Sequence, residues 1–177
     1  MSGSEPRALR TERLLLRPFR PADVDAVARY ATDEKYLRFL SPTHPEPDEF
    51  VAHNVDVDWS VERSWVITLH REIVGSAFLG INEEDDAAEL ACLVAPEFWR
   101  RGIAFEASCA VVGHAFGELG LSKVVARADA RHESSIGLMA KLGMQPHGER
   151  RGPVGRDGAD AGELIYGVLR DDWQPPA

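Results

Sequence analysis

The segment Glu89–Ala104 combines residue types and spacing that suit phosphate binding. A basic pair, Arg100 and Arg101, follows an apolar run and a proline turn, and it precedes Gly102 and an apolar helical pattern. The first N–H groups of a helix lack partners within it and carry about half a positive charge, so they attract phosphate. Gly102 and the alanine at 104 leave this backbone uncovered. The segment therefore predicts an anion site, although a basic pair before a helix is more often a solvated surface.

Other reactive residues lack the spacing that a site needs. The six histidines contain no H-x-x-x-H pair, so we expect no metal site. Neither G-x-G-x-x-G nor G-x-x-x-x-G-K-(S/T) occurs, which disfavours the common nucleotide-binding folds. Cys92 and Cys109 stand outside any C-x-x-C motif and are expected to be free thiols. We interpret the acidic run 82–86 as a solvated hairpin tip.

Periodicity predicts the elements that position the phosphate-binding segment. Residues 102–119 should form the longest helix, ended by Gly120 as a C′ glycine. An apolar stripe with spacings of 4, 3, 4 and 3 residues should be its buried face, namely Phe105, Cys109, Val112, Phe116 and Leu119. With strands at 89–94 and 124–128 on either side, the helix completes a strand, helix, strand unit.

A meander should precede this unit and a hairpin should follow it. In chain order, the expected strands are 14–16, 65–69, 73–81, 89–94, 124–128, 144–152 and 164–169. The other expected helices begin at Pro21 and span 49–55 and 134–142. We also expect a mobile glycine-rich loop at 155–162.

Composition limits the classes of protein that remain. The chain has 177 residues, 44% of them hydrophobic, which suits one domain over residues 10–173 and leaves no room for a second full domain. The formal net charge of −9 disfavours nucleic acid and anionic membranes as partners, and it favours a cationic one. No stretch has the composition of a membrane span or a signal peptide, so we expect a cytoplasmic protein.

The phosphate-binding segment resembles the pyrophosphate loop of the GNAT acyltransferases. That loop is written Gln/Arg-x-x-Gly-x-Gly/Ala, and this sequence matches it at Gly102 and Ala104 while Trp99 takes the Gln/Arg position. The RimJ/RimL-like branch writes the segment A-E-(I/L)-G-Y-W-L-x-P-(E/x)-(Y/F)-W-G-(K/R)-G-Y-A, which residues 88–104 resemble closely. The match is too long to arise by chance.

Two further stretches resemble the same branch at their proper distances. Residues 11–18 look like its first strand, and residues 135–144 are similar to its N-x-x-S-x-x-L-x-E-K-L-G-F motif. The resemblance covers roughly residues 10–173. The departures are His132 for the Asn, Ala140 for the Glu, Met144 for the Phe and Cys92 for the usual aromatic. They leave the acceptor substrate open.

The resemblance implies an α/β fold, an α+β mixed sheet of about seven strands with about four helices. Its fourth and fifth strands should splay apart to admit acetyl-CoA, the cosubstrate of the family. In the family the pantetheine arm pairs with the end of the fourth strand, and the pyrophosphate lies on the loop amides. The cofactor-binding positions assigned in this way are Cys92, Leu93, Val94, Arg100, Arg101, Gly102, Ile103, Ala104 and His132.

Attack on a thioester needs a neutral amine, and at pH 7 fewer than about one lysine side chain in a thousand is neutral. A base therefore helps. The superfamily often keeps a carboxylate at the entry to the fourth strand, which makes Glu89 the candidate base and Glu163 the second candidate. The alternative interpretation of Glu89 is a solvated glutamate at the end of a strand.

The departing thiolate benefits from a proton donor, which elsewhere in the superfamily is a tyrosine on the helix after the fifth strand. Met139 stands there in this chain, and the resemblance points instead to Ser135. The alternative for Ser135 is a hydrogen bond to its own helix backbone. Cys92 has no neighbouring histidine to activate it, so an acetyl-cysteine route is disfavoured.

The resemblance predicts an N-acetyltransferase that moves an acetyl group from acetyl-CoA to a primary amine by direct attack in a ternary complex. The acceptor would be a protein or peptide N-terminus or a small amine, and it would be cationic before reaction. The rival hypothesis is a non-catalytic acyl-CoA sensor. A homodimer, the identity of the acceptor and the length of the acyl group remain open.

Overall fold

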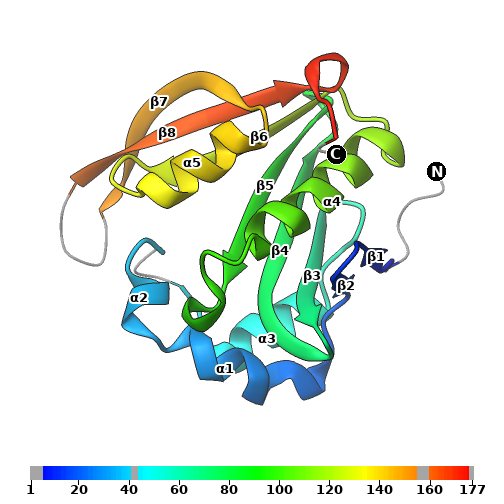
Figure 1. Cartoon of the computed structure of the whole chain (residues 1–177), viewed down its shortest axis with the longest axis vertical. Helices are drawn as coiled ribbons and strands as arrows, with labels where there is room; N and C mark the ends of the chain where they lie inside the picture. The colour runs from blue at the N-terminus through cyan, green and yellow to red at the C-terminus, as the bar shows by residue number, and fades with distance from the viewer. Residues whose placement is uncertain (1–5, 41–43, 155–159, 176–177) are drawn as a thin grey trace.

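The β-strands of the chain form one eight-stranded sheet, with the spatial order β1-β2-β3-β4-β5-β6-β8-β7 (Figure 1). The computed structural model describes residues 6–40, 44–154 and 160–175, with backbone alone at 152–154 and 160–161. The strands are β1 Leu9–Arg10, β2 Leu14–Arg17, β3 Glu62–Leu69, β4 Glu72–Asn82, β5 Ala87–Val94, β6 Lys123–Asp129, β7 Gln145–Val154 and β8 Asp160–Leu169. The α-helices are α1 Val24–Ala31, α2 Glu34–Leu37, α3 Pro47–Val55, α4 Ile103–Gly117 and α5 Glu133–Lys141.

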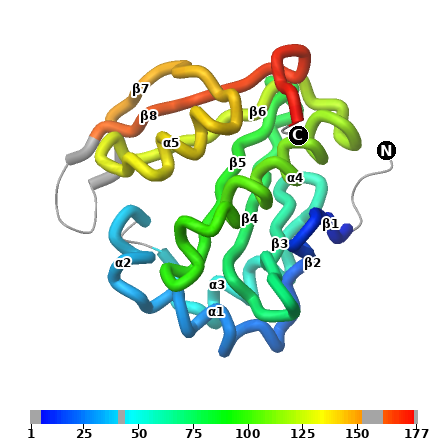
Figure 2. The backbone as a smooth tube through the Cα atoms, in the orientation of Figure 1, coloured from blue at the N-terminus to red at the C-terminus, as the bar shows by residue number. Residues whose placement is uncertain are grey.

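All neighbouring strands are antiparallel except β5 and β6, which are parallel and joined through α4. The predicted meander and the strand, helix, strand unit are therefore confirmed. The β5–β6 ladder pairs residues 87–90 with 123–126 and goes no further, whereas β5 stays paired with β4 as far as Val94. The two strands consequently splay apart, as expected, and Figures 1 and 2 show them diverging.

Helices cover the sheet on both faces. On one face α4 lies over β3, β4 and β5, and α5 lies over β6 and β8 (Figure 1). The α4 core includes Leu79, Leu90, Val111 and Val124, each at most 5% exposed. On the other face α1 and α3 pack over β3 and β4 around Val66 and Phe50.

The buried face of α4 differs from the stripe that spacing predicted. Val112 and Phe116 are buried as expected, but Phe105, Cys109 and Leu119 are only partly buried. The helix instead buries a row four residues apart, consisting of Ile103, Ala107, Val111 and Ala115. Since α4 is apolar almost all round, large side chains could not identify its inner face, and the inner face carries small residues because the helix lies close to the sheet.

Three further differences concern the extent and number of elements. The sheet has eight strands rather than about seven, because the two-residue β1 pairs with β2. The described residues form five α-helices rather than about four, since the short α2 has too little periodicity to reveal itself. Strand β7 ends two residues later than predicted, and β8 begins inside the predicted glycine-rich loop, whose residues 155–159 lie outside the described residues. No α-helix in the described part of the chain is long and apolar enough to span a membrane.

Candidate active site

The backbone of β5 presents unpaired groups where β6 departs. The Ala95 amide donates to the Val74 carbonyl at 2.9 Å, which places the odd-numbered residues of β5 in the hydrogen-bonded pairs with β4. The amide and carbonyl groups of Cys92 and Val94 therefore face the opening between β5 and β6. The Val94 carbonyl accepts a hydrogen bond from the Trp99 indole at 2.6 Å. The remaining groups can pair with an extended chain that carries amides, as pantetheine does.

The loop before α4 turns its backbone so that the first helical amides point outward. Arg100 and Gly102 have positive φ angles of 62° and 76°. Gly102 is the N-cap of α4 and supplies no side chain to bond the free amides. Ile103 is 2% exposed and packs in the core, so it can contribute its amide alone to an anion. The 15-residue helix adds its dipole to this site.

An acidic residue in the first turn of α4 is neutralised by partners in the turn between β1 and β2. Glu106 lies 2.7 Å from the Arg13 guanidinium and also accepts a hydrogen bond from the Arg13 amide at 3.0 Å. Burial would raise the pKa of Glu106, but the bonds from Thr11 and Arg13 hold it below its usual value. Arg13 also donates to the Arg101 carbonyl at 3.2 Å, which anchors the loop. The positive potential at the helix start is thereby preserved.

Cys92 lies in the opening with its thiol directed at α4. Its Sγ is 3.9 Å from the Ala104 carbonyl oxygen. Burial raises the pKa of the Cys92 thiol to about 12, although the Ser108 hydroxyl beside it has the opposite effect. The thiol is therefore protonated at neutral pH, which makes it a poor nucleophile.

Glu89 lies on the face of the sheet opposite α4. Its neighbours Ala88 and Leu90 are buried in the α4 core, so alternation directs Glu89 to the other face. Its carboxylate is 3.2 Å from the Arg127 guanidinium of β6, and its side chain is 41% exposed. Glu89 is opposite Val125, one residue before the last pair of the β5–β6 ladder. It thus stands next to the point where the strands separate, within reach of water.

Glu163 lies on the same face, two strands further along the sheet. It pairs in register with Asp129 of β6, and its carboxylate forms an ion pair with Arg150 of β7. Its side chain is 18% exposed. Sequence reasoning had named both glutamates but could not identify the arginine that pairs with each, because those partners come from other strands.

Ser135 and His132 belong to the start of α5, on the far side of the opening from β5. Ser135 is partly buried in the first turn, and its amide donates to the His132 carbonyl at 3.0 Å. The His132 ring stacks on Phe39, with centroids 4.1 Å apart. Burial lowers the pKa of His132, and Arg38 adds to this effect whereas Asp129 opposes it. The face of the ring that Phe39 covers is not available to a cofactor.

Two tyrosines that the sequence did not single out lie near the opening. Tyr30 of α1 and Tyr36 of α2 are 1% and 6% exposed, and their ring centroids are 5.1 Å apart. The Tyr30 hydroxyl shares a hydrogen bond with Ser76 Oγ at 3.1 Å. The Tyr36 hydroxyl has no hydrogen-bond partner among the residues described. A four-residue helix is too short to show a periodic pattern, so the sequence did not predict α2 or a role for Tyr36.

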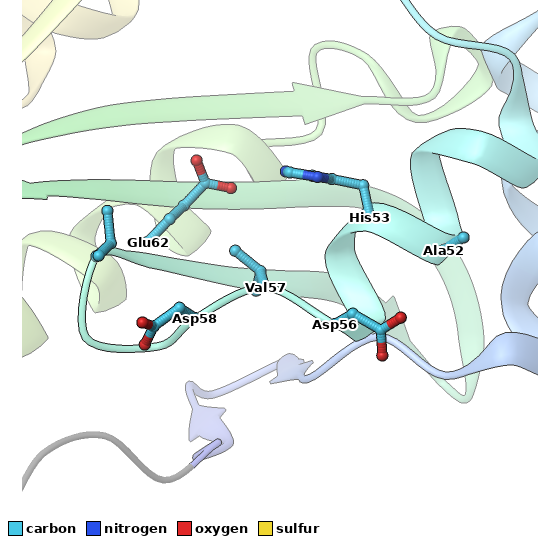
Figure 3. A pocket seen from close by; sticks show the side chains of 7 residues that line it. Ala52, His53, Asp56, Val57, Asp58 and Glu62 are labelled. Atoms are coloured by element: carbon cyan, nitrogen blue, oxygen red, sulfur yellow. The ribbon is translucent and has the colours of Figure 1, made fainter.

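An open hollow of about 580 Å³ lies where α3 ends and β3 begins. Figure 3 shows Val57 in the middle of the view, with His53, Asp56, Asp58 and Glu62 around it. Glu62 is in register with Gly80 of β4, which is in register with Glu89. Because Gly80 has no side chain, nothing on β4 separates the two glutamates at this level of the sheet.

Comparison with known proteins identifies the family. A profile of the Acetyltransferase (GNAT) domain matches residues 13–145, so the chain belongs to the GNAT acetyltransferase family. It is 25% identical over 174 residues to an uncharacterized N-acetyltransferase, YoaA, of Bacillus subtilis (strain 168), covering 92% of this chain and 96% of that protein. The family resemblance read from the sequence is thereby confirmed.

Solved structures share the fold. A GNAT-family acetyltransferase from Bacillus anthracis superposes with a TM-score of 0.82 at 22% identity, covering 93% of this chain and 99% of that one. Mycobacterium smegmatis RimJ, solved in complex with CoA-disulfide, gives a TM-score of 0.81 at 20% identity over 97% of this chain and 91% of its own. The predicted α/β fold class is therefore confirmed.

Proposed function

We propose that this chain transfers an acetyl group from acetyl-CoA to a primary amine. The observation that carries the proposal is the splayed β5–β6 pair beside an uncapped helix start. The amide and carbonyl of Cys92 and the amide of Val94 suit the polar groups of pantetheine, and the free amides of α4 suit the pyrophosphate. Arg100 and Arg101 add positive charge next to the same amides. An acyl-CoA would thus lie with its thioester near Cys92 and Leu93.

The transfer would proceed by direct attack of the amine on the thioester carbon. Glu89 or Glu163 would remove the amine proton, directly or through water, and the exposed Glu89 carboxylate has access to water. Ser135, on the α5 side of the opening, would supply a proton to the departing thiolate. We favour Glu89 because it stands at the point of strand separation, on the face that α5 leaves uncovered.

Direct attack is favoured over a covalent route through Cys92. The raised pKa of that thiol leaves it un-ionised at neutral pH, and its closest polar contacts belong to α4 rather than to a base. A ternary-complex mechanism gives intersecting double-reciprocal lines. A covalent intermediate gives parallel lines and leaves an acetylated protein when acceptor is withheld.

The acceptor is proposed to be cationic before it reacts. The formal net charge of −9 attracts cations over a long range. The hollow is lined by Asp56, Asp58 and Glu62, and Glu62 lies in register with Glu89 across Gly80, on the same face of the sheet. Additional amines on a peptide or polyamine could occupy that hollow while one amine reaches the thioester.

An acceptor screen with acetyl-CoA tests the proposed function. Release of thiol would be measured with peptide N-termini, polyamines, aminoglycosides and amino acids, and each product would be identified by mass. We expect at least one amine to yield a product heavier by one acetyl group. A non-catalytic acyl-CoA sensor would bind acetyl-CoA with no acceptor-dependent release of thiol. Acetyl-CoA that neither bound nor reacted would contradict both functions.

A further inference from the structure

Two neighbouring tyrosines are buried alike but differ in their hydrogen bonds. The Tyr30 hydroxyl is satisfied by Ser76, whereas the Tyr36 hydroxyl has no partner in the part of the chain that the structure describes. A buried hydroxyl without a partner destabilises the folded protein, because it has given up its hydrogen bonds to water. Retaining one next to a candidate active site suggests that a ligand supplies the missing partner.

Contacts on either side place Tyr36 at the opening between β5 and β6. On the β5 side, its neighbour Tyr30 bonds to Ser76, which is in register with Leu93. On the other side, Phe39, three residues after Tyr36, stacks on His132 at the start of α5. The segment 36–39 therefore bridges the opening, at the level of the unpaired β5 backbone.

The electrostatic neighbours of Tyr36 agree with this position. Burial raises the pKa of the Tyr36 phenol far above its usual value, and Tyr30 and Cys92 raise it further. Cys92 is the β5 residue beside which the proposed function places the thioester. At any pH suited to acetyl transfer, Tyr36 is a neutral hydroxyl that can donate a hydrogen bond but cannot serve as a base.

We propose that the Tyr36 hydroxyl donates its hydrogen bond to the thioester carbonyl oxygen of bound acyl-CoA and stabilises the oxyanion that forms there. This inference rests on the proposed function and adds a catalytic residue to it. The amine nitrogen attacks the carbonyl carbon, a C–N bond forms, and the carbonyl π electrons move to the oxygen. The oxyanion then re-forms the double bond, the C–S bond breaks with its electron pair on sulfur, and the amine proton passes to the base. Tyr36 keeps its proton throughout.

The substitution Tyr36→Phe tests the inference, with Tyr30→Phe as the matched control. Loss of a single oxyanion donor typically lowers kcat by about 10²- to 10³-fold, and we expect Tyr36→Phe to fall in that range. Calorimetry should show acetyl-CoA binding several-fold more weakly while CoA, which lacks the carbonyl, binds as before. Tyr30→Phe should retain most of the kcat and the same ratio of the two affinities.

Thermal unfolding separates a catalytic hydroxyl from a structural one. The Tm of free Tyr36→Phe should equal or exceed that of the unaltered protein, since an unpaired buried hydroxyl is removed. Tyr30→Phe should lower the Tm, because Ser76 loses its partner. If Tyr36→Phe leaves both kcat and the ratio of CoA to acetyl-CoA affinity unchanged, the role of Tyr36 is refuted. The proposed function is not affected by that result. Failure of the unaltered protein to bind acetyl-CoA would refute the inference together with the proposed function.

Discussion

Glu89 shows how much of a candidate site is decided by a single side chain and its partner. The residue stands at the entry to a predicted strand, but only the structure supplies Arg127 at 3.2 Å and an open face above the pair. The ion pair with Arg127 fixes the position of the Glu89 carboxylate beside the point where β5 and β6 separate. The exposure of Glu89 permits proton transfer through water as well as directly.

Substitution of Glu89 by Gln should lower kcat by about 10² to 10⁴, the range typical of losing a general base. The acidic limb of the kcat pH profile should disappear with it, because no carboxylate remains to be protonated. The measurement is the rate of thiol release against pH with the best acceptor. Glu72→Gln is the control. Glu72 is exposed at the start of β4, whereas Glu89 lies opposite Gly80 near the end of that strand.

Ser135→Ala should lower kcat less than Glu89→Gln does, because water can protonate a thiolate. Full activity of Glu89→Gln at neutral pH would contradict the assignment. Glu163 would then be the candidate base, and Glu163→Gln would test it in the same assay.

The site was only partly predictable at the residue scale. The loop Arg100–Ala104 could be found because its charges, glycine and position before a helix are adjacent in the sequence. Tyr36 could not be found in this way. Its significance depends on the Tyr30–Ser76 bond and on the Phe39–His132 stack, which join α1 and α2 to strand β4 and the start of α5.

At the scale of elements, α4 connects the anion site to a cluster of charged residues around the buried His114 near its other end. His114 is 6% exposed, and its ring lies edge-on to Trp65 with centroids 5.8 Å apart. Its Nδ1 is 3.6 Å from the Glu118 carboxylate, which also pairs with Arg7. Burial lowers the pKa of His114; Glu118 opposes this shift, and Arg63 of β3 contributes to it.

This shift predicts that the protein loses stability in mild acid. Above the unfolded pKa of about 6.5, His114 is neutral in both states and the contribution to stability is complete. Below it, the unfolded chain binds a proton that the folded chain does not, so the free energy of unfolding decreases as the pH falls toward the folded pKa. Urea unfolding between pH 7 and pH 5 measures the decrease.

His114→Gln should reduce that dependence on pH, whereas His70→Asn should not. His70 is exposed in the turn between β3 and β4, at a φ of 49° that asparagine tolerates. A pH dependence that is the same in His114→Gln and in the unaltered protein would contradict the assignment to this residue. His132, whose pKa is lowered too, would be the next candidate.

The sequence predicted the boundaries of elements best where a glycine follows an apolar helical run. The positive φ angle of Gly143 marks the end of α5, as its position after an apolar run predicted. Helix α4 ends at Gly117 rather than at 119, so Gly120, which also has a positive φ, follows the helix without being its C′ residue. The inner face of α4 was mispredicted because Ile103, Ala107, Val111 and Ala115 compete with larger side chains on the same helix. Size alone does not reveal which face meets a sheet at close range.

At the scale of the whole molecule, the net charge predicts how the KM of the acceptor depends on salt. Attraction between a chain of net charge −9 and a cation is screened by salt, so the KM of the acceptor should rise with ionic strength. Glu62→Gln should raise the KM at low salt and weaken its salt dependence, because Glu62 lines the acidic hollow and lies on the same face of the sheet as Glu89. Initial rates at several salt concentrations measure both effects.

Glu72→Gln again provides the control, since it removes the same charge at a distance from the hollow. It should change the salt dependence only slightly. An anionic best acceptor, or a KM indifferent to ionic strength, would contradict the proposal of a cationic substrate.

The central claim is that the loop before α4 holds the pyrophosphate of acetyl-CoA. Isothermal titration of acetyl-CoA into the unaltered protein, Gly102→Ala and Gly102→Glu tests it most directly. Both substitutions strain the positive φ of 76°, and an added Cβ meets only the Arg13 guanidinium at 3.5 Å, so Gly102→Ala controls for backbone strain. The account predicts binding to the unaltered protein, weaker binding to Gly102→Ala and none to Gly102→Glu, with circular dichroism showing all three folded. Equal affinity in Gly102→Glu, or no binding to the unaltered protein, would contradict it.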